Sequence, residues 1–359
     1  MRIAIPSETA ARERRVALTP DSVTRLIKGG HEVVVTRGAG TSAGFPDEAF
    51  AGAGARLADD LESTVAGADI VAKVRPPSER EADAIPAGAT LLCLLHPSRN
   101  GAVIERLKQR GVQALALELV PRITRAQSMD VLSSQATVAG YKAALLGAAE
   151  LDKFLPMLTT AAGNVPPAKA FVIGAGVAGL MAIATARRLG AIVSAFDVRP
   201  AAREQVMSLG ASFVASELVS ASAEASGGYA RAQTAEEQAA TREAVAKHAA
   251  EMDLIITTAQ VPGRPAPRLL DAATVRAMRP GTVIVDLAAE GGGNVELTKP
   301  GETVDVGGVR ILGPLDLAAT VPYHASQMFG KNILALVGEL VKDDRIDVGG
   351  EIGSAMVVT

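Results

Sequence analysis

Short runs of apolar residues alternate along the chain with longer segments whose apolar positions recur at helical spacing. The short runs predict buried strands, and the longer segments predict helices that cover them. In the first third of the chain the runs are Ile3 to Pro6, Glu32 to Thr36, Asp69 to Val74, Thr90 to Leu95 and Val112 to Leu119. Strands that alternate with helices in this way are typical of a parallel sheet with helices on its faces.

The remainder of the chain repeats this alternation. Its runs are Ala170 to Ile173, Ile192 to Asp197, Ser212 to Ala215, Leu254 to Thr258, Thr282 to Leu287 and Val309 to Leu312. Two such sets predict an α/β fold with two doubly wound, Rossmann-like parallel-sheet domains and a cleft between them. We expect the first domain to comprise residues 1–132 and 318–359, and the second residues 133–317.

Two longer segments predict helices outside the alternating pattern. An Ala-rich stretch from Ser133 to Phe154 predicts a helix that bridges them. The segment from Tyr323 to Val341 predicts a helix that returns to pack on the first domain. Because a cleft between domains is a common place for a ligand, the strand ends that would face it are the first places to look for functional residues.

Composition narrows the classes of function. The 359 residues include 36 Lys and Arg against 39 Asp and Glu, and this net charge of −3 argues against binding nucleic acid or anionic lipid through bulk charge. Cys93 is the only cysteine, so no internal disulfide can form and a reducing compartment is expected. We find no signal peptide, no apolar run long enough to span a membrane and no clustered metal ligands, and expect a soluble chain without a metal site.

A glycine-rich turn, Gly174 to Gly179, follows the strand predicted at 170–173 and opens a helix. Gly174 permits a tight turn, Gly176 lets the backbone approach a pyrophosphate, and Gly179 lets helix and strand pack closely. The phosphates would lie on the free N–H groups at the start of the helix. A glycine turn without a ligand is the alternative, but the strand before it and the helix after it favour dinucleotide binding.

An acidic residue stands where this motif needs one. Asp197 ends the next predicted strand, and its carboxylate can accept both ribose hydroxyls of NAD while repelling the 2′-phosphate of NADP. Arg199, two residues on, weakens this argument because a guanidinium there can neutralise that phosphate. We therefore expect NAD(H) to be favoured over NADP(H).

The segment from Ser220 to Ala244 contains no Val, Leu, Ile, Met or Phe. Such a segment cannot anchor itself in a core, so a loose loop leading into an Ala/Glu helix is one interpretation. The other is a mobile lid in which Gly227 and Gly228 act as a hinge and Tyr229 closes over a bound ligand.

An unusually polar stretch, Arg122 to Gln135, follows the last strand of the first domain. It is either a solvated loop with a helix cap at Ser133 or Ser134, or a functional loop at the carboxyl end of a strand. Three cations also lie near strand ends of this domain: Arg15, Lys73 (inside the predicted strand at 71–74) and His96. Together they could bind and protonate a 2-oxo acid, although each alone is more often a surface side chain.

At these residues the chain resembles the soluble NAD(H)-binding component of proton-translocating NAD(P) transhydrogenase, a family related to alanine dehydrogenase. The matching stretches are Arg15 to Pro20, Pro121 to Ser134, Ala161 to Gly163, Val165 to Ala168, Gly174 to Gly179, Gly227 to Ala230 and Val283 to Ala288. The stretch PRITRAQSMD that begins at Pro121 is the most specific, since alanine dehydrogenases carry a different sequence there.

The resemblance implies hydride transfer between NAD(H) on this chain and NADP(H) on a partner subunit, coupled to proton movement through a membrane domain. It implies a homodimer that docks on membrane-spanning transhydrogenase subunits at the cytoplasmic side of the inner membrane. Because no spanning segment precedes the end at Thr359, the separate-subunit form is expected.

The resemblance also assigns roles to residues. Arg122, Gln127, Asp130 and Ser133 match the residues that hold the nicotinamide end of NAD(H) near the partner's NADP(H), and are the expected catalytic set. The residues expected to bind the nucleotide are Gly174, Ala175, Gly176, Val177, Ala178, Gly179, Asp197, Val198, Arg199, Gly228, Tyr229, Ala259 and Leu287.

Two other functions remain open from the sequence. One is L-alanine dehydrogenase, since Arg15, Lys73 and His96 match positions that bind or protonate pyruvate in that family. Against it stand the stretch from Arg122 to Ser133 and Glu290, which occupies the place of that family's catalytic Asp. The other is an inactive NAD-sensing module, for which nothing specific speaks.

Overall fold

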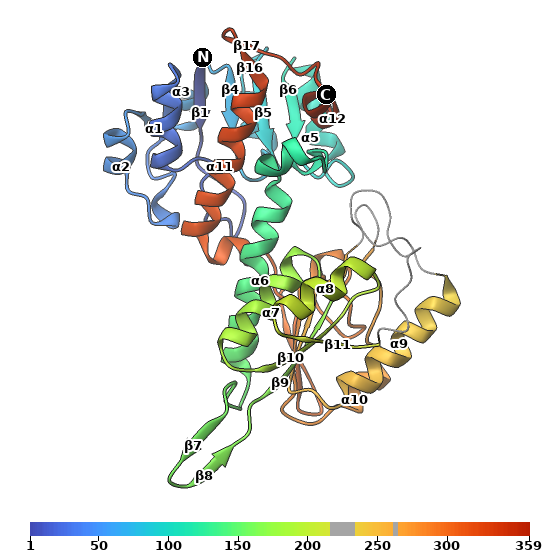
Figure 1. Ribbon diagram of the computed structural model, residues 1–359. Coiled ribbons are helices and arrows are strands. Elements are labelled where there is room, and N and C mark those ends of the chain that lie inside the picture. Colours follow the sequence, from blue (N-terminus) through green and yellow to red (C-terminus); the bar gives the residue numbers. More distant parts are fainter. Residues whose placement is uncertain (216–233, 261–264) are drawn as a thin grey trace. The chain divides into compact units, whose positions relative to one another are not determined.

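The computed structural model describes residues 1–215, 234–260 and 265–359, which form two compact units (Figure 1). The N-terminal unit comprises Met1–Gln135 and Ala318–Thr359, and the central unit comprises Ala136–Leu317. Each unit is described by itself below. In the described ranges no helix is both long and apolar enough to cross a membrane.

The sheet of the N-terminal unit has six parallel strands in the order β3-β2-β1-β4-β5-β6. They are β1 (Arg2–Ile5), β2 (Glu32–Thr36), β3 (Arg56–Ala58), β4 (Ile70–Ala72), β5 (Thr90–Cys93) and β6 (Gln113–Ala116). The helices of this unit are α1 (Pro20–Lys28), α2 (Asp47–Gly52), α3 (Leu61–Val65), α4 (Glu79–Ala84), α5 (Gly101–Gln109), α11 (Pro322–Leu340) and α12 (Glu351–Met356). The 3₁₀ turns η1 (Thr41–Ala43), η2 (Leu117–Leu119) and η3 (Thr124–Met129) and the hairpin β16 (Val341–Lys342) with β17 (Arg345–Ile346) complete it.

The sheet of the central unit has the order β11-β10-β9-β12-β13-β15-β14. Its strands are β9 (Lys169–Ile173), β10 (Ile192–Phe196), β11 (Ser212–Phe213), β12 (Leu254–Thr257), β13 (Val283–Asp286), β15 (Val309–Leu312) and the antiparallel edge strand β14 (Thr303–Val306). Its helices are α7 (Val177–Arg188), α8 (Pro200–Ser208), α9 (Ala235–Ala249) and α10 (Ala272–Arg276). The 3₁₀ turn η7 (Ala289–Gly291) and the hairpin β7 (Leu158–Thr160) with β8 (Gly163–Val165) also belong to it, whereas η8 (Leu317–Thr320) and α6 (Val131–Glu150) pass from one unit into the other.

Alternation along β1 shows how the sequence builds the N-terminal core. Ile3 and Ile5 join the apolar cluster on one face of the sheet, while Ala4 between them joins the cluster on the other. Helix α11 lies beside α1 (Figure 1) and adds Phe329 and Ile333, both fully buried, to the first cluster. The expected return of the last long helix to the first domain is therefore confirmed.

A glycine in α6 sets the approach of two helices in the central unit. A Cβ at Gly140 would lie 2.0 Å from the carbonyl oxygen of Ala178, in the first turn of α7. Only a residue without a side chain fits there, so α6 passes directly against the start of α7. Ala143 and Ala144 of α6 then pack in the same apolar cluster as Ala182 of α7.

The predicted fold class is confirmed, and most strands lie where the apolar runs placed them. The strands that the sequence analysis did not predict are short or at edges: β3, β14 and the two hairpins β7–β8 and β16–β17. Lys73 was predicted inside a strand, which is wrong because β4 ends at Ala72. Lys73 instead follows the strand, at the carboxyl edge of the sheet.

Candidate functional site

The strand order of the central unit reverses at β9, which pairs with β10 on one side and β12 on the other. Ligands bind open α/β sheets at such a switch point, beyond the carboxyl ends of the strands. The predicted glycine turn begins here: Gly174 follows β9 directly and has a φ of +95°. A Cβ on Gly174 would also lie 2.7 Å from the Thr258 hydroxyl oxygen, so both backbone conformation and space require glycine.

The other two glycines differ in their surroundings. A Cβ on Gly179 would lie 1.9 Å from the Gly174 carbonyl oxygen, so this glycine permits the first turn of α7 to pack on the turn itself. Among the residues that the structure describes, a Cβ on Gly176 would meet no atom within 4 Å. Because Gly176 is also the N-cap of α7, whose first N–H groups have no partner within the helix, the open space adjoins hydrogen-bond donors that fit a phosphate.

Asp197 lies beside this turn, directly after β10, with 7% of its surface exposed. One carboxylate oxygen accepts a hydrogen bond from the Ala175 N–H at 2.8 Å, so the acidic residue and the glycine turn hold each other in place. Arg199 pairs with the same carboxylate, with its Nε 2.9 Å and a terminal guanidinium nitrogen 2.8 Å from the two oxygens. The predicted residues Asp197 and Arg199 therefore lie together beside the glycine turn.

Several predicted nucleotide-binding residues surround this point. Val177 is exposed, whereas Ala178 and Val198 are half-buried. The backbone nitrogen of Ala259 would lie 3.0 Å from a Cβ on Gly174, and the Leu287 N–H donates to the Thr257 carbonyl at 2.9 Å. Gly228 and Tyr229, together with the hinge at 227–228, lie outside the described residues. Of the segment at 220–244, residues 235–244 belong to α9.

Sequence reasoning missed two buried residues that hold the loops at this edge. Asn294 accepts from the Ala259 N–H at 3.0 Å and donates to the carbonyls of Ala259 and Pro267, both at 2.8 Å. It thereby fixes Ala259, just after β12, next to the glycine turn. The signal in the sequence was the glycine run that precedes Asn294, which marks a tight turn after β13.

The second missed residue, Asp286, is fully buried at the end of β13. Its carboxylate accepts hydrogen bonds from the hydroxyls of Thr257 and Thr298, at 2.9 and 2.7 Å, and from the N–H groups of Ala288 and Val295. Because a buried carboxylate is costly unless its oxygens are satisfied, these donors must stay in place. Asp286 therefore fixes the loop that carries Asn294.

In the N-terminal unit, the polar loop after β6 contains the turn η3. Ala126 and Met129 of this turn are buried, whereas Gln127 on it and Arg122 just before it are exposed. Asn332 of α11 donates to the Ser128 carbonyl at 2.7 Å, so the loop is anchored on its inner side while its polar side chains are exposed. Polar side chains on a fixed turn are suited to holding a ligand.

Asp130 and Ser133 lie together at the start of α6. Asp130 accepts from the Ser133 N–H at 2.9 Å and from its hydroxyl at 2.6 Å, which makes Asp130 the N-cap of the helix. The sequence analysis named Ser133 or Ser134 as the possible helix cap. That prediction is wrong, because Asp130 is the cap and Ser133 donates hydrogen bonds to it.

Arg15 is buried and paired within the protein. Its guanidinium contacts both carboxylate oxygens of Glu13, at 2.6 and 2.8 Å, and donates to Gln135 at 2.8 Å. Burial alone would raise the pKa of Glu13, but hydrogen bonds and charge from Arg15, with Arg75 beside it, lower that pKa to about 2. The pair is therefore charged at neutral pH.

Lys73 and His96 also have carboxylate partners in the N-terminal unit. Lys73 donates to Glu81 at 2.8 Å and lies 3.5 Å from Glu8, whose pKa is raised by burial. The His96 ring lies 3.9 Å from Glu118. All three cations predicted to bind a 2-oxo acid thus face acidic side chains of the chain itself. The described residues include no group of three or more His, Cys, Asp or Glu that could hold a metal ion.

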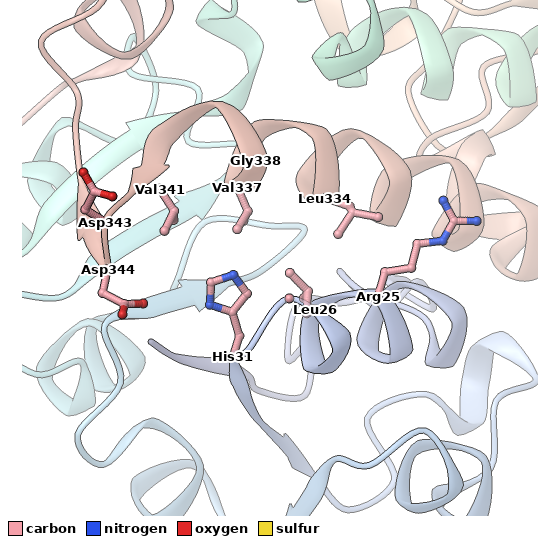
Figure 2. Close-up of a pocket in the computed structure, with 10 residues that line it drawn as sticks. Arg25, Leu26, His31, Leu334, Val337, Gly338, Val341, Asp343 and Asp344 are labelled. Carbon is pink, nitrogen blue, oxygen red and sulfur yellow. The ribbon is translucent and has the colours of Figure 1, made fainter.

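A cavity of about 320 Å³ lies elsewhere in the N-terminal unit, between α1 and α11 (Figure 2). Leu26, Leu334 and Val337 form its apolar wall, and His31 faces Asp344 across it. Burial lowers the pKa of His31, so its ring is neutral at pH 7. No residue predicted to bind or position a nucleotide lines this cavity, and we do not assign it to the candidate site.

Both halves of the chain match known families. Residues 4–139 match the family described as alanine dehydrogenase/PNT, N-terminal domain, and residues 143–352 match alanine dehydrogenase/PNT, C-terminal domain. The chain is 46% identical over 350 residues to an NAD(P) transhydrogenase alpha subunit of Rhodospirillum rubrum, in a match that covers 96% of this chain and 91% of that protein. The resemblance drawn from the residues is confirmed.

A solved structure of transhydrogenase from Sinorhizobium meliloti superposes with a TM-score of 0.91 at 44% identity, covering 100% of this chain and 98% of that one. Alanine dehydrogenase of Mycobacterium tuberculosis is 34% identical over 303 residues, covering 84% of this chain and 76% of that protein. Similarity to transhydrogenase is therefore higher and extends over more of the chain.

The open space at Gly176 gives a test of the candidate site. Gly176→Ala should change the free energy of unfolding by no more than about 1 kcal/mol, because its Cβ meets no neighbour and only the N-cap preference is lost. It should weaken NADH binding at least about 10-fold, since the methyl group takes the space of a phosphate, measured by NADH fluorescence titration.

Two other glycines provide controls. Gly338→Ala, in α11, also adds a Cβ to open space and should leave NADH binding unchanged. Gly179→Ala should destabilise the protein by about 1 to 3 kcal/mol or more through overpacking. Unchanged NADH affinity in Gly176→Ala would show that no phosphate lies at this turn.

The Glu13 pair predicts a pH dependence of stability. Because folding lowers the pKa of Glu13 from 4.5 to about 2, its contribution of about 3 kcal/mol is complete above pH 4.5 and is lost as the pH falls toward 2. In Glu13→Gln, stability at pH 7 should be lower and should fall less steeply between pH 5 and 3, measured by urea unfolding. Glu48→Gln, an exposed glutamate on α2, should keep the original slope.

Proposed function

The chain belongs to the alanine dehydrogenase/PNT family, and we propose that it is the NAD(H)-binding component of a proton-translocating NAD(P) transhydrogenase. It would exchange hydride between NAD(H) on this chain and NADP(H) on a partner subunit. The observation that carries the proposal is the space that the described residues leave open at Gly176, next to the hydrogen bond between Ala175 and Asp197, in a chain that is 46% identical to a transhydrogenase subunit.

The glycine turn and its neighbours would bind the dinucleotide. Bound NAD(H) supplies or accepts the hydride at its nicotinamide ring. The N–H groups at the start of α7 would hold the pyrophosphate, and Asp197 would accept hydrogen bonds from the adenosine ribose. Asp286 and Asn294 keep the loops after β12 and β13 fixed around this turn, so that little ordering is needed on binding.

The polar loop would orient the nicotinamide. Hydride transfer between two nicotinamides needs no acid or base, and what the protein must supply is close positioning and exclusion of water. The exposed Arg122, just before η3, and the exposed Gln127, on η3, would contact the nicotinamide end. Asp130, which caps α6, and its hydrogen-bond partner Ser133 would fix the position of that loop. Tyr229 would close over the nucleotide.

Alanine dehydrogenase is less well supported as the function. The identity to that enzyme is 34% against 46% for the transhydrogenase subunit. Glu290, at the place of the catalytic Asp of that family, accepts the Asp316 N–H at 3.0 Å. Its longer side chain moves the carboxylate by one methylene, a displacement large enough to lower a catalytic rate about 10²-fold.

We further propose that the chain is a homodimer and that it docks, through partner subunits that hold NADP(H) and span the membrane, on the cytoplasmic side of the inner membrane.

Support for the dimer comes from the surface of the central unit. The hairpin β7–β8 projects from it (Figure 1), and a two-stranded hairpin is only marginally stable alone. Phe154 and Met157, which precede the hairpin, are 60% and 66% exposed. A second copy that covers this surface would bury both.

The dimer proposal predicts a mass of twice 36.7 kDa in sedimentation equilibrium. Met157→Asp should shift the protein toward the monomer, because a charge would be buried in the interface. Met207→Asp, at a methionine of α8 that is 54% exposed, should leave the mass unchanged. A monomeric wild-type chain, or equal effects of both substitutions, would contradict the proposal.

The proposed activity is tested by reconstitution. The chain carries one glycine turn with its acidic partner, so the pure chain should bind NADH and show almost no transfer from NADPH to an NAD analogue. Addition of a soluble NADP(H)-binding partner should restore transfer without a membrane, because the second nicotinamide must lie within about 3 to 3.5 Å of the first. Stopped-flow absorbance measures the rate.

Two variants separate positioning from binding in the same assay. Gln127→Asn should slow transfer about 10²-fold with little loss of NADH affinity. Thr124→Ser, at an exposed neighbour on η3, should leave both unchanged. Rapid transfer by the chain alone would refute the proposal, as would reduction of pyruvate with ammonium and NADH.

A further inference from the structure

The carboxylate of Asp197 accepts four hydrogen bonds from the described residues. One oxygen accepts from the Ala175 N–H and from a terminal guanidinium nitrogen of Arg199, both at 2.8 Å. The other accepts from the Arg199 N–H and from Arg199 Nε, both at 2.9 Å. A carboxylate has about four acceptor positions, so these donors fill its capacity. Ribose hydroxyls can bind Asp197 only if one or more of these donors withdraw.

The guanidinium is the donor that can withdraw. The Ala175 N–H belongs to the glycine turn, and the Arg199 N–H belongs to the N-cap residue of α8, so both are held by the backbone. The Arg199 side chain is 19% exposed and makes its two bonds to Asp197 from the end of a long flexible stem. Its departure removes two of the four hydrogen bonds, which is the number that a ribose diol can replace.

We propose that Arg199 is a specificity-determining residue, whose guanidinium exchanges with the two ribose hydroxyls at Asp197 and limits discrimination between NAD(H) and NADP(H). This inference rests on the proposed function, since it assumes that Asp197 receives the adenosine ribose. Asp197 alone favours hydroxyls and repels a 2′-phosphate. Arg199 acts against both preferences, because it competes with the hydroxyls and neutralises the charge that repels the phosphate.

The direction of the effect follows from this competition. In Arg199→Ala the hydroxyls should meet a carboxylate with free acceptor positions, and a 2′-phosphate should meet an unneutralised negative charge. The ratio of the dissociation constants of NADPH and NADH should therefore rise by a factor of about 10 to 150, the range for one charged hydrogen bond. Arg199→Lys should give a smaller rise, since an ammonium keeps the charge but cannot form the two-pronged contact.

The experiment measures both dissociation constants by fluorescence titration at fixed ionic strength, with folding of each variant checked by its thermal midpoint. Arg203→Ala is the matched control: it removes the same charge from an exposed position on α8 and should leave the ratio unchanged. A ratio in Arg199→Ala that is equal to the wild-type ratio, or to that of Arg203→Ala, would overturn the proposal. If Arg199→Ala does not fold, the ratio in Arg199→Lys decides in the same way.

A second pair of probes separates this inference from the function. Adenosine 5′-monophosphate carries the free ribose hydroxyls, and adenosine 2′,5′-bisphosphate carries the 2′-phosphate, yet neither contains nicotinamide. Arg199→Ala should strengthen binding of the first and weaken binding of the second in isothermal titration. If the wild-type chain binds NADH but shows no transfer even after the NADP(H)-binding partner is added, the proposed function fails, while the responses of the two probes still decide the inference. If transfer occurs and both probes bind Arg199→Ala as they bind the wild type, only the inference fails.

Discussion

Steric contact at the turn after β9 is the constraint on which the central unit, and the nucleotide site proposed there, depends. The turn is enclosed on three sides at distances that exclude even a methyl group: α7 at Gly179, the Thr258 hydroxyl at Gly174, and α6 through Gly140 against Ala178. At Gly176 alone among these glycines no atom lies within reach of a Cβ. The backbone donors of α7 are therefore presented in one direction, by packing and not by any charged side chain.

A second layer of hydrogen bonds makes this geometry rigid. Asp286 has no cationic partner among the described residues and is satisfied entirely by hydroxyl and N–H donors from β12 and from the loop after β13. Asn294, carried by that loop, ties the loop after β12 to it. Since loss of any one donor would leave a buried acceptor unsatisfied, the loops around the turn are held as a unit. The proposed transfer between two nicotinamides would benefit from such rigidity, because errors of position enter the rate directly.

What the sequence predicts well is local. The parallel strands, the glycine turn and Asp197 follow from short patterns whose physical reasons operate within a few residues of each other. The glycine run before Asn294 marks a turn, but it does not reveal the hydrogen bonds of Asn294, because the partner Ala259 is 35 residues away. The edge strand β14 was missed for a related reason: it alternates exposed and half-buried residues, so it lacks an apolar run. Arg199 was recognised as ambiguous, but its two-pronged contact with Asp197 depends on the backbone at the start of α8, which only the structure provides.

The discontinuous N-terminal unit has a consequence for biosynthesis. Its core includes Phe329, Ile333 and Leu336 of α11, which are translated long after the six strands that they cover. At ribosomal rates of about 5 to 20 residues per second, the roughly 200 residues from Gln135 to Leu340 take about 10 to 40 s to synthesise. During that interval the first sheet has emerged with one apolar face incomplete, while the central unit already has its whole sequence before α11 exists. The N-terminal unit can therefore complete its core only after the whole central unit has been synthesised, and one apolar face of its sheet stays uncovered until the last long helix arrives.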